Sequence, residues 1–150
     1  MTGNEILQLA AGLYASNQPK SEALCRAIVG RSYYAAYHLA LSLLADLGLP
    51  RTSDHRLPPL WLTESGVPQA RRAGRILEEL YQARRRADYE LTHAAAVRES
   101  RDLQFVKAHI EMAADVKLLL AACALEPARS QVQAGIQAFL QRMGKLSGRS

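Results

Sequence analysis

Ten residues near the middle of the chain, Arg84–His93 (RRRADYELTH), combine three adjacent arginines, an Asp-Tyr pair and a histidine. On a continuous helix Arg86 and His93 lie within about 20° of each other, with Tyr89 between them on the same face. A histidine can transfer a proton near neutral pH, and an arginine can stabilise the charge that grows on phosphate oxygens during phosphodiester cleavage. Arg86 and His93 are therefore a candidate catalytic pair that needs no metal.

A charged, solvated helix surface would explain the same residues. In that interpretation Asp88 pairs with Arg84 or Arg85 one turn earlier, and His93 is simply exposed. Arg84 and His93 point to opposite faces of a continuous helix, so only a helix break near Tyr89 could bring them together. Taken by themselves, these residues favour the charged surface.

Tyrosines concentrate in a second stretch, residues 31–40 (RSYYAAYHLA), which holds three of the six tyrosines in the chain. Tyr33 and Tyr37 lie on one helix face, and Tyr34 and His38 lie on the adjacent one. A tyrosine combines a large apolar body with one hydroxyl, which suits helix packing and subunit interfaces. We therefore expect a tyrosine-rich core, and we keep Tyr34 and His38 as secondary site candidates.

Metal and cofactor motifs are weak or missing in this sequence. Glu90-x-x-His93 matches half of a di-iron carboxylate pattern, but a bundle site of that kind needs a second such motif, which the sequence lacks. Cys25 and Cys123 lie far apart within apolar helical patterns, which indicates two buried free thiols. A glycine-rich phosphate loop is also missing from the sequence. We expect neither a metal nor a cofactor.

Apolar residues recur at helical spacing through most of the chain, and strand signals are nearly absent. This pattern predicts an all-α fold, an antiparallel bundle of four to five helices. The four prolines between residues 49 and 68 predict a long connection with one short helical turn around Leu60, and a short break is expected near Ala94–Val97. Helices are expected over residues 4–16, 20–47, from 68 into the arginine stretch, 98–125, and at the end of the chain around 132–143.

A length of 150 residues fits one domain, with the helical bundle over residues 1–126 and an additional helix and polar tail over 127–150. The formal charge is +5, and residues 69–107 hold nine basic side chains against six acidic ones. Such an excess favours an anionic partner such as RNA. The start of the chain lacks a signal-peptide pattern, and no apolar run approaches the roughly 18–20 residues of a membrane span. We therefore expect a cytoplasmic location without membrane contact.

Two of these segments together resemble the HEPN family, which includes short stand-alone bacterial and archaeal proteins. RSYYAAY (residues 31–37) is similar to the family's SRxYYAxF string, and LYQARRRADY (residues 80–89) is similar to its LYxxRxxADY string. The two strings occur in the family's order and at its separation, and the resemblance covers residues 5–125. His55, in the connection between them, stands where the family often has a histidine.

The resemblance implies an antiparallel helical bundle that dimerises, with the two arginine-containing helices meeting at a shared cleft. Catalytic members of the family are metal-independent endoribonucleases with an arginine, four to six further residues and a histidine, often in toxin–antitoxin or antiviral (phage-defence) systems. Arg86 and His93 satisfy that spacing and so inherit the phosphate-stabilising and acid/base roles. The last helix lies beyond the resemblance, and its apolar stripe would either pack on the bundle or widen the dimer interface; we predict the second. Four residues would arrange the cleft and bind phosphate: Arg84, Arg85, Asp88 and Tyr89.

The resemblance also supports a second hypothesis, a catalytically silent module. The arginine that aligns with the RxxADY string is Arg84, and the position at which a histidine would follow it is occupied by Tyr89. A silent protein of this kind would be a dimer that binds an anionic ligand, or an antitoxin or nucleotide-binding partner beside a nucleotidyltransferase. The expected partners are therefore RNA, a second copy of the chain, and a cognate nucleotidyltransferase or antitoxin; a purely structural helical protein is the third possibility.

Overall fold

The computed structural model describes residues 1–16 and 20–147, and all regular secondary structure within these ranges is helical, which confirms the all-α prediction. None of the described helices combines the length and the apolar character that a bilayer crossing requires. Where we predicted four to five helices, the described residues form seven. These are α1 (Gly3–Ala15), α2 (Glu22–Asp46), α3 (Leu57–Glu64), α4 (Pro68–Tyr89), α5 (Ala94–Arg101), α6 (Leu103–Cys123) and α7 (Ala128–Ser147).

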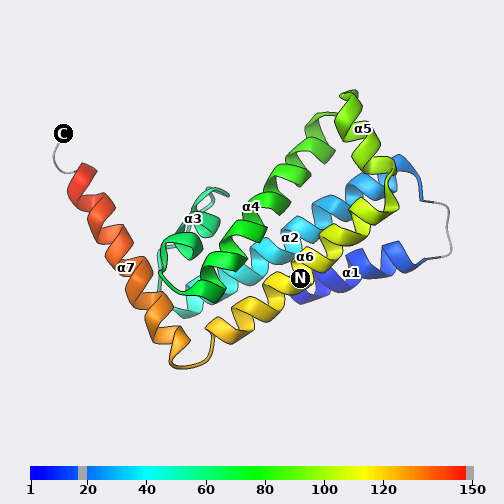
Figure 1. Ribbon diagram of the computed structural model, residues 1–150. Coiled ribbons are helices and arrows are strands. Elements are labelled where there is room, and N and C mark those ends of the chain that lie inside the picture. Colours follow the sequence, from blue (N-terminus) through cyan, green and yellow to red (C-terminus); the bar gives the residue numbers. More distant parts are fainter. Residues whose placement is uncertain (17–19, 148–150) are drawn as a thin grey trace.

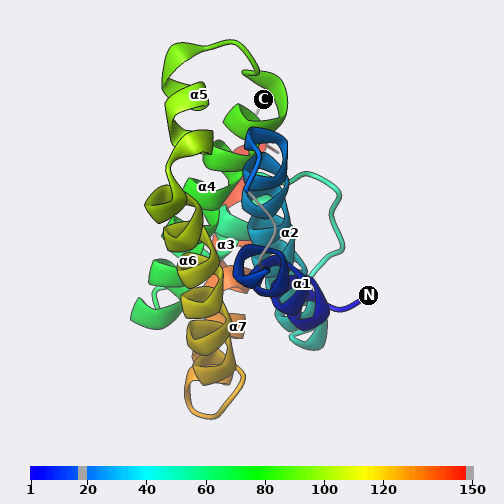
Figure 2. The same ribbon diagram turned by 90° about the vertical axis from the view of Figure 1, so that its right-hand side faces the viewer.

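Four helices, α1, α2, α4 and α6, lie side by side, with α1 and α4 running antiparallel to α2 (Figures 1 and 2). Helix α2 packs against all three others, and its small residues such as Ala36 and Ala40 let the neighbouring backbones approach closely. The core around it contains the fully buried side chains of Tyr33, Leu77 and Val116. Because α2 is covered on most sides, its apolar residues are not confined to one stripe.

Several helix ends follow from local sequence signals. Thr2 caps α1 in a capping box with Glu5, and the Ser21 hydroxyl caps α2. Gly48 takes a φ of +73° directly after α2, a conformation that a glycine adopts at little cost, so the predicted end of this helix is confirmed. Pro68 occupies the first turn of α4, as expected.

The proline-rich connection contains a real helix, α3, where we predicted a single turn. Pro58 and Pro59 are compatible with it because they stand in the first helical turn, where a backbone N–H has no helical partner. Trp61 and Leu62, further along the same helix, are buried in the core. Burial of these two apolar side chains provides the stabilisation that eight residues of helix would lack alone.

A second difference concerns residues 94–125, where we predicted a short break and then one helix from Arg98. The break lies earlier, at residues 90–93, and Ala94–Arg101 is itself a helix, α5. The chain then turns at Asp102, whose carboxylate accepts hydrogen bonds from the backbone N–H groups of Gln104 and Phe105 and so caps α6. An aspartate in this position favours a helix start over a helix interior.

Helix α7 packs against α3 and α6, Arg129 and Gln133 donate hydrogen bonds to the Asp46 and Leu47 carbonyls at the end of α2, and the second half of α7 extends away from the bundle (Figure 1). Val132 and Ile136 are fully buried on its inner face. Gly135 allows the close approach, because a Cβ atom at this position would lie 1.8 Å from the Ser65 carbonyl oxygen. The close packing of α7 against the bundle therefore requires a glycine, which has no side chain, at position 135.

Gly135→Ala is expected to lower the free energy of unfolding by about 2 kcal/mol, because α7 must move off a rigid backbone carbonyl to accommodate the methyl group. Gly12→Ala is the matched control: Gly12 lies in helix α1 with nothing within 4 Å of the added methyl group. That substitution is expected to stabilise by up to about 1 kcal/mol through helix propensity. Urea denaturation of both variants measures the difference, and equal effects would contradict the packing described for Gly135.

Candidate functional site

Helix α4 ends at Tyr89, so the continuous helix on which we placed Arg86 and His93 does not exist. His93 is the N-cap residue of α5 and its side chain is 63% exposed, with Glu90 as its nearest charged neighbour at 3.9 Å. The Arg86 guanidinium turns toward α5, where its Nε donates to Glu99 Oε2 at 3.0 Å. Among the described residues, no hydrogen bond or ion pair joins Arg86 to His93.

A buried arginine on α2, Arg26, explains why α4 ends at Tyr89. Its Nη1 donates to the carbonyl oxygens of Arg86 at 3.3 Å and Ala87 at 2.9 Å, and its Nη2 donates to the Leu91 carbonyl at 3.4 Å. The Arg86 carbonyl also accepts from the Glu90 N–H, whereas the Ala87 carbonyl is one of the last carbonyls of the helix, which lack an intrahelical partner, and this guanidinium supplies one. Its Nε and Nη2 also hold Glu22, one turn earlier on α2. Sequence reasoning missed Arg26; its signal was one arginine inside the apolar stretch of residues 23–30 (ALCRAIVG).

Arg84 lies where the two motif-bearing helices meet. Its Nη2 donates to the Tyr34 hydroxyl on α2 at 2.8 Å, and its Nε lies 2.8 Å from Asp88 Oδ2 one turn later on α4. The Nε–H is buried and does not point at the carboxylate, so this contact is an ion pair without a well-aligned hydrogen bond. The Arg84 guanidinium carbon also lies 5.2 Å from the ring centre of Tyr34 and 5.7 Å from that of Tyr89, within cation–π range. The arginine is thereby held in one orientation, with its side chain 15% exposed.

A groove of about 540 Å³ opens beside this arginine. Tyr34 and Asp88, the two partners of Arg84, form part of its wall, and Arg31 and His38 are exposed on the same wall. Arg31 makes no hydrogen bond or ion pair with any residue that the structure describes. The rest of the lining is mainly apolar and comes from α1 and α2: Met1, Ile6, Leu9, Ala27 and Gly30.

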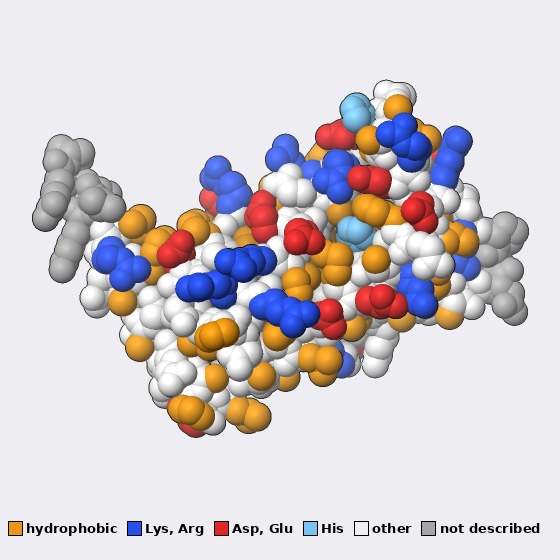
Figure 3. Space-filling view, viewed as in Figure 1, with side chains coloured by type: hydrophobic (Ala, Val, Ile, Leu, Met, Phe, Trp, Pro, Cys, Tyr) orange, Lys and Arg blue, Asp and Glu red, His pale blue; other side chains and the backbone are white. Residues whose placement is uncertain are grey.

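Basic side chains do not dominate every face of the protein. On the face shown in Figure 3, Lys and Arg side chains alternate with Asp and Glu side chains. Part of the excess of positive charge that we noted in residues 69–107 is also neutralised by acidic neighbours such as Glu99, the partner of Arg86. An anionic ligand would have to be recognised by local groups such as Arg31 and Arg84, since exposed mixed charges attract it only weakly.

His55 reaches from the connection between α2 and α3 into a slot between tyrosine rings. It stacks on Tyr37 with ring centres 4.4 Å apart and lies parallel to Tyr81 at 6.1 Å. Its Nδ1 shares a hydrogen bond of 2.5 Å with the hydroxyl of the fully buried Tyr33. Burial and the nearby charge of Arg84 lower the pKa of His55, and burial raises the pKa of Tyr33. At neutral pH both groups are therefore uncharged, and the hydroxyl can donate to the imidazole.

The structure thus separates the predicted site residues into two groups. Arg85, although adjacent to Arg84, is exposed and lies over the Tyr81 ring at 5.8 Å. Arg84, Asp88, Tyr89 and Tyr34 come together, and His38 and His55 reach them through ring contacts with Tyr34, whereas Arg85, Arg86 and His93 lie outside this group. Tyr33, Tyr37 and Tyr81, which support the site from behind, could be found only as an aromatic pattern with helical spacing.

The described residues contain no group of three or more His, Cys, Asp and Glu side chains that could hold a metal ion. Cys25 and Cys123 are buried free thiols, and burial raises the pKa of each. The groups left for chemistry at the groove are the Arg31 guanidinium, one phenol hydroxyl, one carboxylate and the exposed imidazole of His38, with the Arg84 guanidinium behind Tyr34 and Asp88. Such a set binds an anion that also carries a flat or apolar part.

Compared with known proteins, the chain matches no protein-family profile, no curated protein and no solved structure.

Proposed function

We propose that this chain is a HEPN-like protein that binds RNA through the groove beside Arg84. The observation that carries the proposal is the junction of Arg84 with Tyr34 and Asp88, because it joins the two sequence segments on which the family resemblance rests. A guanidinium held against aromatic rings is oriented before a ligand arrives, so less freedom is lost when it binds a phosphate. The unpaired Arg31 on the same wall supplies a second positive charge.

The apolar part of the groove suits the other half of a nucleotide. Single-stranded RNA is recognised through unstacked bases that lie on aromatic or apolar side chains while cations hold the backbone. Tyr34, Ile6 and Leu9 line the groove near Arg31. A nucleotide whose base lies against these side chains would place its phosphate within reach of Arg31 and of the Arg84–Tyr34 pair.

We propose binding without cleavage, which is the silent-module hypothesis. Metal-independent cleavage needs an arginine and a proton-transferring histidine at the same phosphate. Arg86 instead pairs with Glu99, and His93 is exposed at the start of the next helix. The role that we propose on the resemblance alone is that of a partner beside a cognate nucleotidyltransferase or antitoxin in a toxin–antitoxin or phage-defence system.

The proposal includes a homodimer that closes the groove. Leu9 is 41% exposed on the groove lining, and Tyr89 is 70% exposed at the end of α4 while covering Arg84. Large apolar side chains exposed around a charged groove are typical of an interface. A second copy placed over α2 and α4 would cover these side chains and bring two Arg84 residues to one cleft, as in the resembled family.

Incubation of the purified protein with a labelled single-stranded RNA in EDTA tests both parts of the proposal. We expect saturable binding by fluorescence anisotropy, weakened as salt rises between about 50 and 200 mM, and an RNA that stays intact on a denaturing gel. Arg31→Ala is expected to weaken binding about tenfold, because it removes one charge-assisted contact. The matched control is Arg75→Ala, an exposed arginine of α4 outside the groove.

Two results would contradict the proposal in different ways. Cleavage that is lost in both Arg86→Ala and His93→Ala would restore the catalytic pair and refute binding without cleavage. Failure to bind either RNA or a mononucleotide at low salt, in a protein with native helix content, would refute the groove as a nucleotide site.

A further inference from the structure

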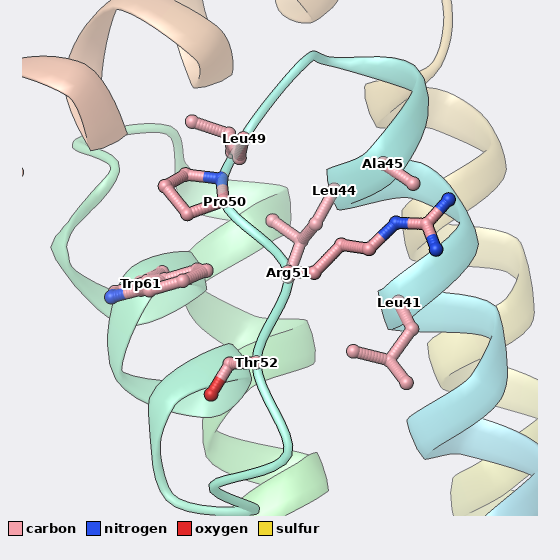
Figure 4. Close-up of a pocket in the computed structure, with 8 residues that line it drawn as sticks. All are labelled: Leu41, Leu44, Ala45, Leu49, Pro50, Arg51, Thr52 and Trp61. Carbon is pink, nitrogen blue, oxygen red and sulfur yellow. The ribbon is translucent and has the colours of Figure 1, made fainter.

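A second cavity lies at the other end of α2, away from the groove beside Arg84. It has a volume of about 230 Å³ and is enclosed by α2, by the segment that follows it and by α3 (Figure 4). None of the residues that line the groove also lines this cavity. Leu41 and Leu44 reach it from α2, Leu49 from the segment, and Trp61 from α3.

The cavity walls are held in place by the fold itself. Trp61, Leu44 and Leu49 are nearly fully buried, and the Leu49 N–H donates to the Leu44 carbonyl at 3.0 Å. The turn at Gly48 is followed by the four residues that the segment contributes to the cavity lining, Leu49, Pro50, Arg51 and Thr52. A preformed apolar cavity of this kind can accept a ligand without a large rearrangement.

Arg51 stands at the mouth of the apolar cavity. In Figure 4 its side chain extends from the segment toward α2, with the guanidinium on the side of Leu41 and Ala45. It makes no hydrogen bond or ion pair with any described residue. Arg56, five residues later in the same connection, is by contrast paired with Asp54. Arg51 is thus a cation without a carboxylate at the edge of an apolar space, which is complementary to an amphiphile with one negative charge.

We propose that this cavity binds a small aliphatic carboxylate, with its head group on Arg51 and its chain against Leu44 and Trp61. At about 30 Å³ for each water-sized group, the cavity holds a chain of about six to eight carbons. The carboxylate accepts hydrogen bonds from the arginine fork on the α2 side of the segment, where Figure 4 shows the guanidinium between Leu41 and Ala45. This site is separate from the proposed RNA groove and stands whether or not the protein binds RNA.

Trp61 is the only tryptophan in the chain, so its fluorescence reports on this cavity directly. We expect butanoate, hexanoate and octanoate to change its emission in a saturable way at constant ionic strength. The affinity should rise roughly fourfold for each added methylene and level off beyond about eight carbons, where the chain no longer fits. Bound octanoate should also raise the melting temperature, since it binds only the folded chain.

Two comparisons separate the carboxylate site from general hydrophobic binding. Octanoate should bind at least about tenfold more tightly than octanol, and Arg51→Gln should remove that difference without changing the affinity for octanol. Arg51 is exposed, so this variant is expected to fold normally. Equal binding of octanoate and octanol to the original chain, a response that never saturates, or unchanged binding in Arg51→Gln would each overturn the proposal. Tighter binding of a peptide with a C-terminal leucine would also overturn it, because the occupant would then be a protein.

Discussion

Arg84→Ala is expected to weaken RNA binding about 100-fold while leaving the helix content unchanged. The substitution removes a charge-assisted contact with phosphate and the cation–π packing that orients the guanidinium, which together are worth about 3 kcal/mol. It also frees Asp88, whose carboxylate would then repel a phosphate in the groove wall. Because the Asp88 side chain is 39% exposed, the fold can tolerate the loss of its partner. Fluorescence anisotropy with a labelled single-stranded RNA gives the affinity.

Arg85→Ala provides the matched control for this experiment. Arg85 has the same charge and is the next residue on α4, but it is exposed, lies over Tyr81 and, among the described residues, makes no hydrogen bond or ion pair with Tyr34 or Asp88 of the groove wall. Removing it changes only the long-range attraction, so we expect a loss of less than about threefold. Arg84→Lys should fall between the two, because the charge remains and the planar fork is lost. Equal effects of Arg84→Ala and Arg85→Ala would show that binding follows net charge and would contradict the site.

Arg26→Met is expected to lower the free energy of unfolding by about 3 kcal/mol. Methionine keeps most of the apolar volume but cannot donate hydrogen bonds, so the buried Ala87 carbonyl loses its donor where α4 ends. An unsatisfied buried polar group costs about 1–3 kcal/mol, and the substitution also removes the bonds of Arg26 to Glu22 and to the partly buried carbonyls of Arg86 and Leu91. Urea denaturation measures the change in stability.

Glu22, which accepts hydrogen bonds from Arg26, also pairs with an exposed arginine, and this second pair provides a control. Arg101 Nε lies 3.3 Å from Glu22 Oε2, and the Arg101 side chain is 70% exposed. Arg101→Met should therefore cost less than about 1 kcal/mol, as is usual for exposed ion pairs. If the two arginine variants were equally destabilised, the ion pair with Glu22 would be the important contact, and the role assigned to Arg26 at the end of α4 would be wrong.

Local signals in the sequence predicted much of the helical framework. The end of α2 and the start of α4 follow from Gly48 and Pro68, whose preferences act within one turn of the chain, whereas the stop predicted for the first helix at Asn17-Gln18-Pro19 lies outside the described residues. The end of α4 could not be predicted in this way, because residues 90–92 (ELT) contain no glycine or proline. It depends on Arg26, some 60 positions earlier in the sequence.

The same distinction between local and distant causes applies to the candidate site. The aligned strings correctly indicated that residues 31–37 and 80–89 lie together, and Arg84 meets Tyr34 at their crossing. The proposed pairing of Arg86 with His93 extended a helical period past the point where the helix stops. The start of α6 has a local signal in Asp102, since an aspartate before an apolar run marks a helix start.

The insertion of His55 between Tyr37 and Tyr81 also bears on how this protein can vary during evolution. The segment between Gly48 and His55 is fixed at both ends. The turn after α2 holds its start, and the stacking and hydrogen bonding of His55 hold its end. Insertions, deletions or substitutions within this segment would change the shape of the cavity beside Trp61, while α3 and α4 keep their register relative to each other. Changes in the length of this segment would therefore alter the cavity beside Trp61 and leave unchanged the groove beside Arg84, none of whose lining residues comes from the segment.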